Sequence, residues 1–135
     1  AGVPRIGGDW GVCDPSNPKN RRRRCSVLIS KTGLDGTTQV LVDTSPDLRE
    51  QLLAAKVGRL DGVLITHDHA DQTHGMDDLR VLVLAAKGRK IDLWSDRFAL
   101  DSLERKFSYI FKTPPNRDYP PILTPHVLPE LFVPF

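Results

Sequence analysis

Cysteine is scarce in this chain of 135 residues, which contains only Cys13 and Cys25. These two do not form a Cys-x-x-Cys pair, so the sequence predicts neither a disulfide framework nor a paired-cysteine zinc site. Long apolar stretches are also missing, because no run approaches the roughly eighteen residues that a transmembrane helix needs. No signal-peptide pattern is present either. The absences predict a soluble, cytoplasmic domain with free thiols.

A large excess of one charge is missing as well, since 19 Lys and Arg residues against 17 Asp and Glu residues leave a formal net charge of +2. That balance argues against bulk binding of nucleic acid. The exception is local, in the tetrapeptide Arg21-Arg22-Arg23-Arg24. A charge run is usually a solvated face, but alternate side chains of an extended segment point to opposite sides, so one pair here can turn inward to contact phosphate.

Histidine is concentrated in one short stretch, because three of the four histidines, His67, His69 and His74, lie within eight residues. The stretch directly follows the apolar run Leu60–Ile65, which is typical of a buried strand. In an extended chain, residues two apart point to the same side, so His67, His69 and Asp71 are expected to converge. Two imidazoles and a carboxylate suit zinc, manganese or iron better than calcium or magnesium.

The segment His67-Asp68-His69-Ala70-Asp71-Gln72 resembles the His-x-His-x-Asp-His signature of the metallo-β-lactamase superfamily of binuclear metallohydrolases. Within that group it is most similar to the phosphoribosyl 1,2-cyclic phosphate phosphodiesterases, with tRNA 3′-end processing endonucleases (RNase Z) as more distant relatives. The resemblance implies two divalent ions, zinc or manganese, with His67 and His69 on the first and Asp71 on the second. It also implies that Asp71 orients the nucleophile.

Gln72 departs from this signature, because it stands where the superfamily has a histidine. An amide oxygen can bind a hard cation but is a poorer donor than imidazole toward zinc. We therefore expect Gln72 to hold the second metal weakly.

Four more residues are candidates for supporting roles. Asp43, at the end of an expected strand, resembles the superfamily's aspartate beside the metal loop and is expected to orient that loop through hydrogen bonds. Asp78 is expected to form a supporting pair, as is the neighbouring Arg80. Arg21, within an Asn-Arg element found near the site of similar proteins, and His74 are candidate substrate contacts. His74 is equally suited to a surface or capping role.

The order of expected elements indicates an α/β-type arrangement. We predict strands at Ser26–Ser30, Thr38–Asp43, Leu60–Ile65 and Lys90–Trp94. We also predict a helix capped by Ser45 with Pro46 in its first turn, a helix over 77–86, and a helix capped by Ser95 or Asp96 that runs to about 107. Residues 109–125 contain five prolines, which predicts irregular structure, either a substrate-facing lid or a surface crossover.

The resemblance implies an αββα sandwich, a fold that takes roughly 200 residues or more. Residues 1–135 are therefore expected to form an incomplete domain, its N-terminal half, with the remainder of the domain or a second chain completing the site. The expected function is that of a metal-dependent hydrolase, a phosphodiesterase acting on a cyclic or nucleotide-like phosphate ester. An RNase Z-like endonuclease and a non-catalytic nucleotide-binding protein are the alternatives.

Overall fold

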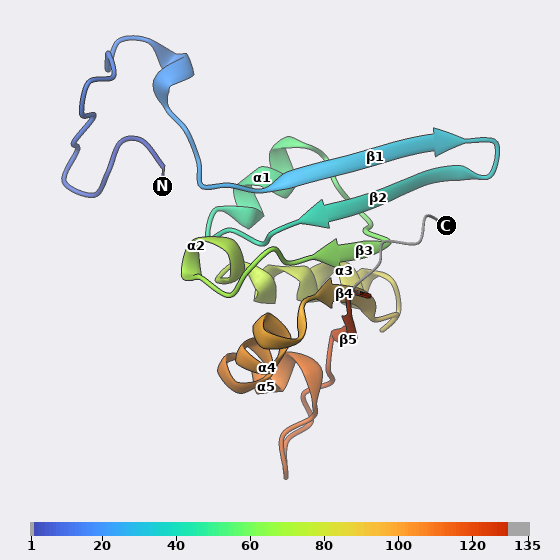
Figure 1. Ribbon diagram of the computed structural model, residues 1–135. Helices are drawn as coiled ribbons and strands as arrows, with labels where there is room; N and C mark the ends of the chain where they lie inside the picture. Colours follow the sequence, from blue (N-terminus) through green and yellow to red (C-terminus); the bar gives the residue numbers. More distant parts are fainter. Residues whose placement is uncertain (1, 130–135) are drawn as a thin grey trace.

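A computed structural model describes residues 2–129. Its centre is a five-stranded sheet in the order β1-β2-β3-β4-β5, in which β1 and β2 are antiparallel and all later neighbours are parallel (Figure 1). The strands are β1 (Val27–Gly33), β2 (Gly36–Val42), β3 (Gly62–Leu64), β4 (Ile91–Ser95) and β5 (Leu123–Val127). The mixed α/β class predicted from the sequence is confirmed.

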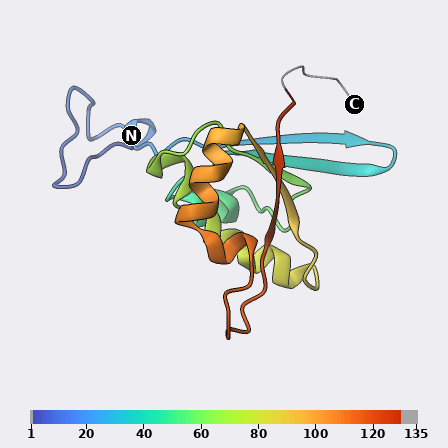
Figure 2. The same cartoon turned by 60° about the horizontal axis from the view of Figure 1, so that its bottom comes forward.

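The helices connect these strands and cover one face of the sheet. They are α1 (Leu48–Ala54), α2 (Ala70–Thr73), α3 (Arg80–Ala85), α4 (Arg97–Lys106) and α5 (Ser108–Phe111), with short 3-10 turns η1 (Pro18–Asn20) and η2 (Met76–Leu79). Figure 2 shows α4 running alongside β5, at the β5 end of the sheet. Among residues 2–129, no helix is long and apolar enough to cross a membrane.

The two faces of the sheet differ in burial. Leu41, Val63 and Leu93 occupy one row of paired residues and are fully buried against the helices. The neighbouring row runs through Val27, Val42, Leu64, Trp94 and His126 on the opposite face. These five side chains are half-buried or exposed, with Val27 54% exposed. The second face is apolar from Val27 to Trp94, carries His126 at the β5 edge, and lacks a covering layer within the described residues.

Of the three helices predicted from the sequence, two differ from the prediction and one begins where expected. Helix α1 begins at Leu48 rather than at Pro46, because the Leu48 N–H closes a turn on the Ser45 carbonyl before the helix. The Ser45 hydroxyl accepts a hydrogen bond from the Asp47 N–H and donates to the Gln51 side chain. The expected helix over 77–86 is divided into η2 and α3. Helix α4 begins as predicted, with the carboxylate of Asp96 accepting a hydrogen bond from the Ala99 N–H.

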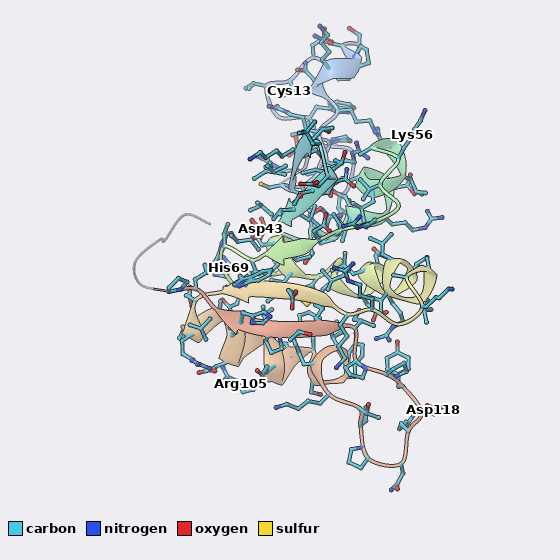
Figure 3. All side chains as sticks on the ribbon, turned by 90° about the vertical axis from the view of Figure 1, so that its right-hand side faces the viewer. Cys13, Asp43, Lys56, His69, Arg105 and Asp118 are labelled. Atoms are coloured by element: carbon cyan, nitrogen blue, oxygen red, sulfur yellow. The ribbon has the colours of Figure 1, made fainter. Side chains whose placement is uncertain are left out.

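The proline-rich segment was predicted incorrectly in two respects. It contains α5 and β5, and Pro125 lies within β5, which has a partner on one side only among the described strands and so tolerates a residue without an N–H. Of the two roles left open for the segment, the substrate-facing lid is wrong and the surface crossover fits. Residues 112–122 precede a parallel strand, so they lie at the opposite end of the strands from the loop that follows β3, and Asp118 lies far from His69 in Figure 3.

Candidate metal centre

His67 and His69 lie side by side at the carboxyl end of β3. Their ring centroids are 4.7 Å apart, with the ring planes inclined at 74°. The chain stays extended through His69, whose φ and ψ are −70° and 155°, so the two rings project to the same side of the loop. Both side chains are exposed. The predicted convergence of these two imidazoles is thus present in the structure.

Asp71 does not join the pair in the manner predicted. The described residues contain no group of three or more His, Cys, Asp or Glu side chains that could hold a metal ion. The reason is local, because α2 begins at Ala70 and replaces the two-residue alternation of extended chain with a helical turn. The alternation argument therefore applies to His67 and His69 only, and a metal role for Asp71 remains a prediction.

A chain of hydrogen bonds connects His67 to the end of β2. The buried carboxylate of Asp43 accepts bonds from the Thr66 N–H at 2.8 Å and from the Thr66 hydroxyl at 2.8 Å and 3.0 Å. The same hydroxyl lies 3.0 Å from Nδ1 of His67. Asp43 has a φ of 61°, in the left-handed region that aspartate tolerates better than most residues. This unusual backbone conformation places the carboxylate beneath the histidine loop.

The direction of these bonds follows from the chemistry of the groups. An ionised carboxylate only accepts, so the single hydroxyl hydrogen of Thr66 is directed to Asp43. The hydroxyl oxygen can then only accept from His67, which requires the ring hydrogen to be on Nδ1. That tautomer leaves the lone pair of Nε2 free. A histidine held in this way is prepared to bind a cation through Nε2.

Asp68 connects the same loop to α4. Its carboxylate accepts hydrogen bonds from the ammonium of Lys106 at 2.8 Å and the hydroxyl of Ser102 at 2.5 Å, and Lys106 also donates to its backbone carbonyl. The bonds from Lys106 and then Ser102 lower the pKa of Asp68 to about 2. Asp68, between the two histidines, therefore fixes the loop to α4, whereas Asp43 fixes it to the end of β2.

Gln72 is buried, and the contacts of its two carbonyl oxygens differ. Its backbone carbonyl accepts bonds from the N–H and hydroxyl of Thr44, at 2.6 Å and 3.2 Å. Its side-chain oxygen Oε1 is buried without a hydrogen-bond partner, the one such side-chain atom found among the described residues. An unpaired buried amide oxygen is costly unless something binds it, and a hard cation is one group that can. The unpaired oxygen is thus free to bind a cation, and a metal role for Gln72 remains a prediction.

Three further residues predicted for the site are exposed and differ in their contacts. His74 is exposed, caps the C-terminus of α2 and places its ring edge-on to Phe107. Arg21 is exposed and follows η1. Asp78 is exposed, and no hydrogen bond of its carboxylate is found among residues 2–129.

Arg80 forms a pair, and its partner is Asp77. The guanidinium of Arg80 bonds Asp77, its near neighbour, rather than Asp78, and also donates to the Pro120 carbonyl and stacks on Tyr119 at 3.8 Å. Arg80 therefore fastens the proline-rich segment to α3. Nothing in these contacts connects it to the histidine pair.

Sequence reasoning missed Thr66 and the contacts of Asp68. A signal for Thr66 was available. Thr66 directly precedes His67, Asp43 ends the neighbouring strand, and residues at the ends of parallel neighbouring strands can contact each other. Ser102 and Lys106 carried a weaker signal, being four residues apart on one face of a helix. Their partner Asp68 is more than thirty residues away in the sequence.

Comparison with known proteins gives three findings. Residues 38–128 match the family model described as "Beta-lactamase superfamily domain". A solved structure described as that of a new diphosphatase from the PhnP family superposes with a TM-score of 0.79 at 32% identity, covering 99% of this chain and 49% of that one. A Porphyromonas gingivalis protein named octanoyltransferase is 34% identical over 130 residues, which are 96% of this chain. The chain spans only 25% of the length of that relative.

Proposed function

Because this chain belongs to the β-lactamase superfamily, we propose that it forms part of a metal-dependent hydrolase of the phosphodiesterase type. The substrate class that we infer is a cyclic or nucleotide-like phosphate ester. The observation that carries the proposal is the pair of imidazoles of His67 and His69, with the hydrogen-bonded chain through Thr66 to Asp43 behind it. Likeness to a diphosphatase of the PhnP family supports phosphorus chemistry over other hydrolyses.

Each residue has a defined task in this proposal. His67 and His69 would hold a divalent ion, zinc or manganese, through ring nitrogens, while Asp71 and the Oε1 oxygen of Gln72 would serve a second ion. A divalent ion in such a site supplies a hydroxide nucleophile near neutral pH and stabilises negative charge on a phosphoryl oxygen. Asp43 and Thr66 fix the ring of His67, and Asp68 fixes the backbone between the two histidines. Asp71 would orient the attacking oxygen, and His74 and Arg21 would contact the substrate.

The site needs further ligands, which we propose come from the rest of the domain or from a second chain. Support comes from the solved relative, which is about twice as long as the matched region. The open face of the sheet, through Val42, Leu64 and Trp94, offers a half-buried apolar surface for the second layer of an αββα sandwich. The cytoplasm remains the proposed location, consistent with the free thiols of Cys13 and Cys25.

Hydrolysis of bis(p-nitrophenyl) phosphate by the full-length protein, loaded with zinc or manganese, tests the proposal. We expect turnover that disappears in His67→Ala and persists in His126→Ala, because His126 lies on the open sheet face against Asp92 and Trp94. Metal bound in normal amount with no hydrolysis of phosphodiesters would favour the non-catalytic binding protein instead. Cleavage of precursor tRNA in preference to small esters would favour the RNase Z-like alternative.

A further inference from the structure

A cleft of about 230 Å³ lies at the end of the strands opposite the histidine loop. Its walls are residues 58–60, which precede β3, the last turn of α3, and residues 89–91, where β4 begins. Because β3 and β4 are parallel, these residues lie at the amino ends of the strands, whereas the histidine loop follows the carboxyl end of β3 (Figure 1). The cleft is therefore separate from the proposed metal site.

The lining of this cleft combines an apolar floor with a basic rim. Three buried or half-buried side chains form the floor: Leu60, Leu82 and Ile91. Three exposed cations form the rim: Arg59, Arg89 and Lys90. No carboxylate of the described residues lines the cleft. Apolar side chains beside uncompensated cations complement a ligand that carries both carboxylates and an apolar group.

Two of the three cations have no partner of their own. Arg59 is bonded to Asp61. Burial raises the pKa of Asp61, but the Gln39 N–H, the guanidinium of Arg59 and the charge of Arg89 together hold it below its usual range, so Asp61 is ionised and balances one positive charge. Within residues 2–129, no side-chain hydrogen bond or ion pair is found for Arg89 or Lys90. Both also lie beyond the last turn of α3, to which the effect of the helix dipole is confined.

An apolar stripe on α3 leads to the cleft. Val81 and Leu84 are 69% and 62% exposed, and Ala85 lines the cleft. Positions i, i+3 and i+4 of a helix share one face, so these three side chains are neighbours. The other side of α3 packs through Val83 on the sheet face that the helices cover. The second sandwich layer proposed above packs on the opposite face of the sheet, so it does not cover this stripe.

We propose that the distal surface, which comprises this cleft and the stripe of Val81 and Leu84, docks an acidic segment of a partner protein. An apolar side chain of that segment enters the cleft, and its carboxylates bind Arg89 and Lys90. The volume of the cleft is below the range of about 300–1,000 Å³ that small-molecule sites occupy, but it accommodates a side chain. No aromatic residue lines the cleft, so it offers no platform for stacking the bases of single-stranded nucleic acid.

Fluorescence anisotropy of a labelled peptide with full-length protein tests this docking. The probe is a helical peptide of about fourteen residues with leucines along one face and glutamates elsewhere. The variant is Arg89→Gln with Lys90→Gln, and the matched control is Arg105→Gln with Lys19→Gln, which removes the same charge from exposed positions outside the distal surface. We expect the Kd to rise about tenfold in the variant and less than twofold in the control. Equal weakening in both, or no saturable binding up to about 1 mM peptide, would overturn the proposal.

The apolar half of the proposal has its own test. Leu84→Gln keeps the charge and a good helix former, so a Kd raised about threefold or more would report the apolar contact alone. A peptide in which serines replace the leucines should bind the unmodified protein about fivefold more weakly than the probe. Equal binding of the two peptides would show that only charge is recognised and would contradict the docking of an apolar side chain.

Two further arms separate the possible failures. His67→Ala should bind the probe as the unmodified protein does, so failure of the hydrolase proposal would not abolish this signal. Single-stranded RNA of about ten nucleotides, and phosphatidylcholine vesicles with about one-fifth phosphatidylserine, should bind more weakly than the probe. If either binds more tightly and loses that binding in Arg89→Gln with Lys90→Gln, the distal surface serves nucleic acid or lipid and the proposal is wrong.

Discussion

Replacing Thr66 with valine removes the link between Asp43 and His67 while keeping the shape of the side chain. The hydroxyl bonds the carboxylate at 2.8 Å, and hydrogen bonds to charged groups contribute about 1.5–3 kcal/mol. Thr66 is exposed, so water can replace part of that interaction and the lower limit applies. About 1.4 kcal/mol corresponds to a tenfold change in an equilibrium constant. Part of that energy is present with and without metal and stabilises the fold alone, so the effect on metal binding comes through the orientation of the His67 ring. Loss of a group behind a ligand weakens metal binding about 10–100-fold, and we expect about tenfold for Thr66→Val.

Competition with a chelator of known affinity measures this change, and nitrogen NMR of the His67 ring at a fixed pH reports which nitrogen carries the hydrogen. Unmodified protein without metal should show the Nδ1–H form, whereas Thr66→Val should show a mixture of both forms. Thr66→Ser keeps the hydroxyl and should bind metal within about twofold of the unmodified protein. Undiminished metal affinity in Thr66→Val, or an Nε2–H ring in the unmodified protein, would refute the reasoning.

Three other changes have defined outcomes. Gln72→His should raise occupancy of the weaker metal site, measured by elemental analysis at limiting zinc; full and equal occupancy of both sites before the change would contradict a weak role for Gln72. Gly75→Ala should destabilise the fold by about 2–3 kcal/mol in urea unfolding, because a Cβ there would lie 2.0 Å from the Ser45 carbonyl oxygen. The bond from Arg24 lowers the pKa of Asp47 to about 2, so this carboxylate contributes stability above about pH 4 that is lost as the pH falls toward 2. Arg24 is 39% exposed, which reduces that contribution to about 1 kcal/mol. Asp47→Asn should remove it, so that the free energy of unfolding changes less between pH 4 and pH 2 than in the unmodified protein.

The histidine pair and the strand before it could be predicted because both depend on local patterns. The segment Leu60–Ile65, apolar at four of its six positions, predicts a buried strand, and its residues 62–64 form β3. The spacing of His67 and His69 predicts a shared side while the chain remains extended. The position of Asp71 could not be predicted in the same way. Helix α2 begins at Ala70 without a side-chain cap on its first N–H groups, so no sequence signal marks the change from extended to helical chain.

Contacts between distant elements were the least accessible to sequence reasoning. The bond from Thr66 to Asp43 depends on the parallel pairing of β2 with β3, and the bonds of Asp68 depend on where α4 packs. The start of α1 was expected too early because the Leu48 N–H closes a turn on the Ser45 carbonyl, and this turn precedes the helix. Of the two caps left open for α4, Asp96 accepts the hydrogen bond from the Ala99 N–H, whereas the Ser95 hydroxyl donates to the distant Ile65 carbonyl.

Metal content tests the central claim most directly. Full-length protein, loaded with zinc and dialysed, should retain tightly bound metal by elemental analysis, and either His67→Ala or His69→Ala should lose it. His126→Ala should retain it, because that ring contacts Asp92 and Trp94 on the open face of the sheet. Stoichiometric metal that survives in both loop variants would show that His67 and His69 are not its ligands and would contradict the proposed site.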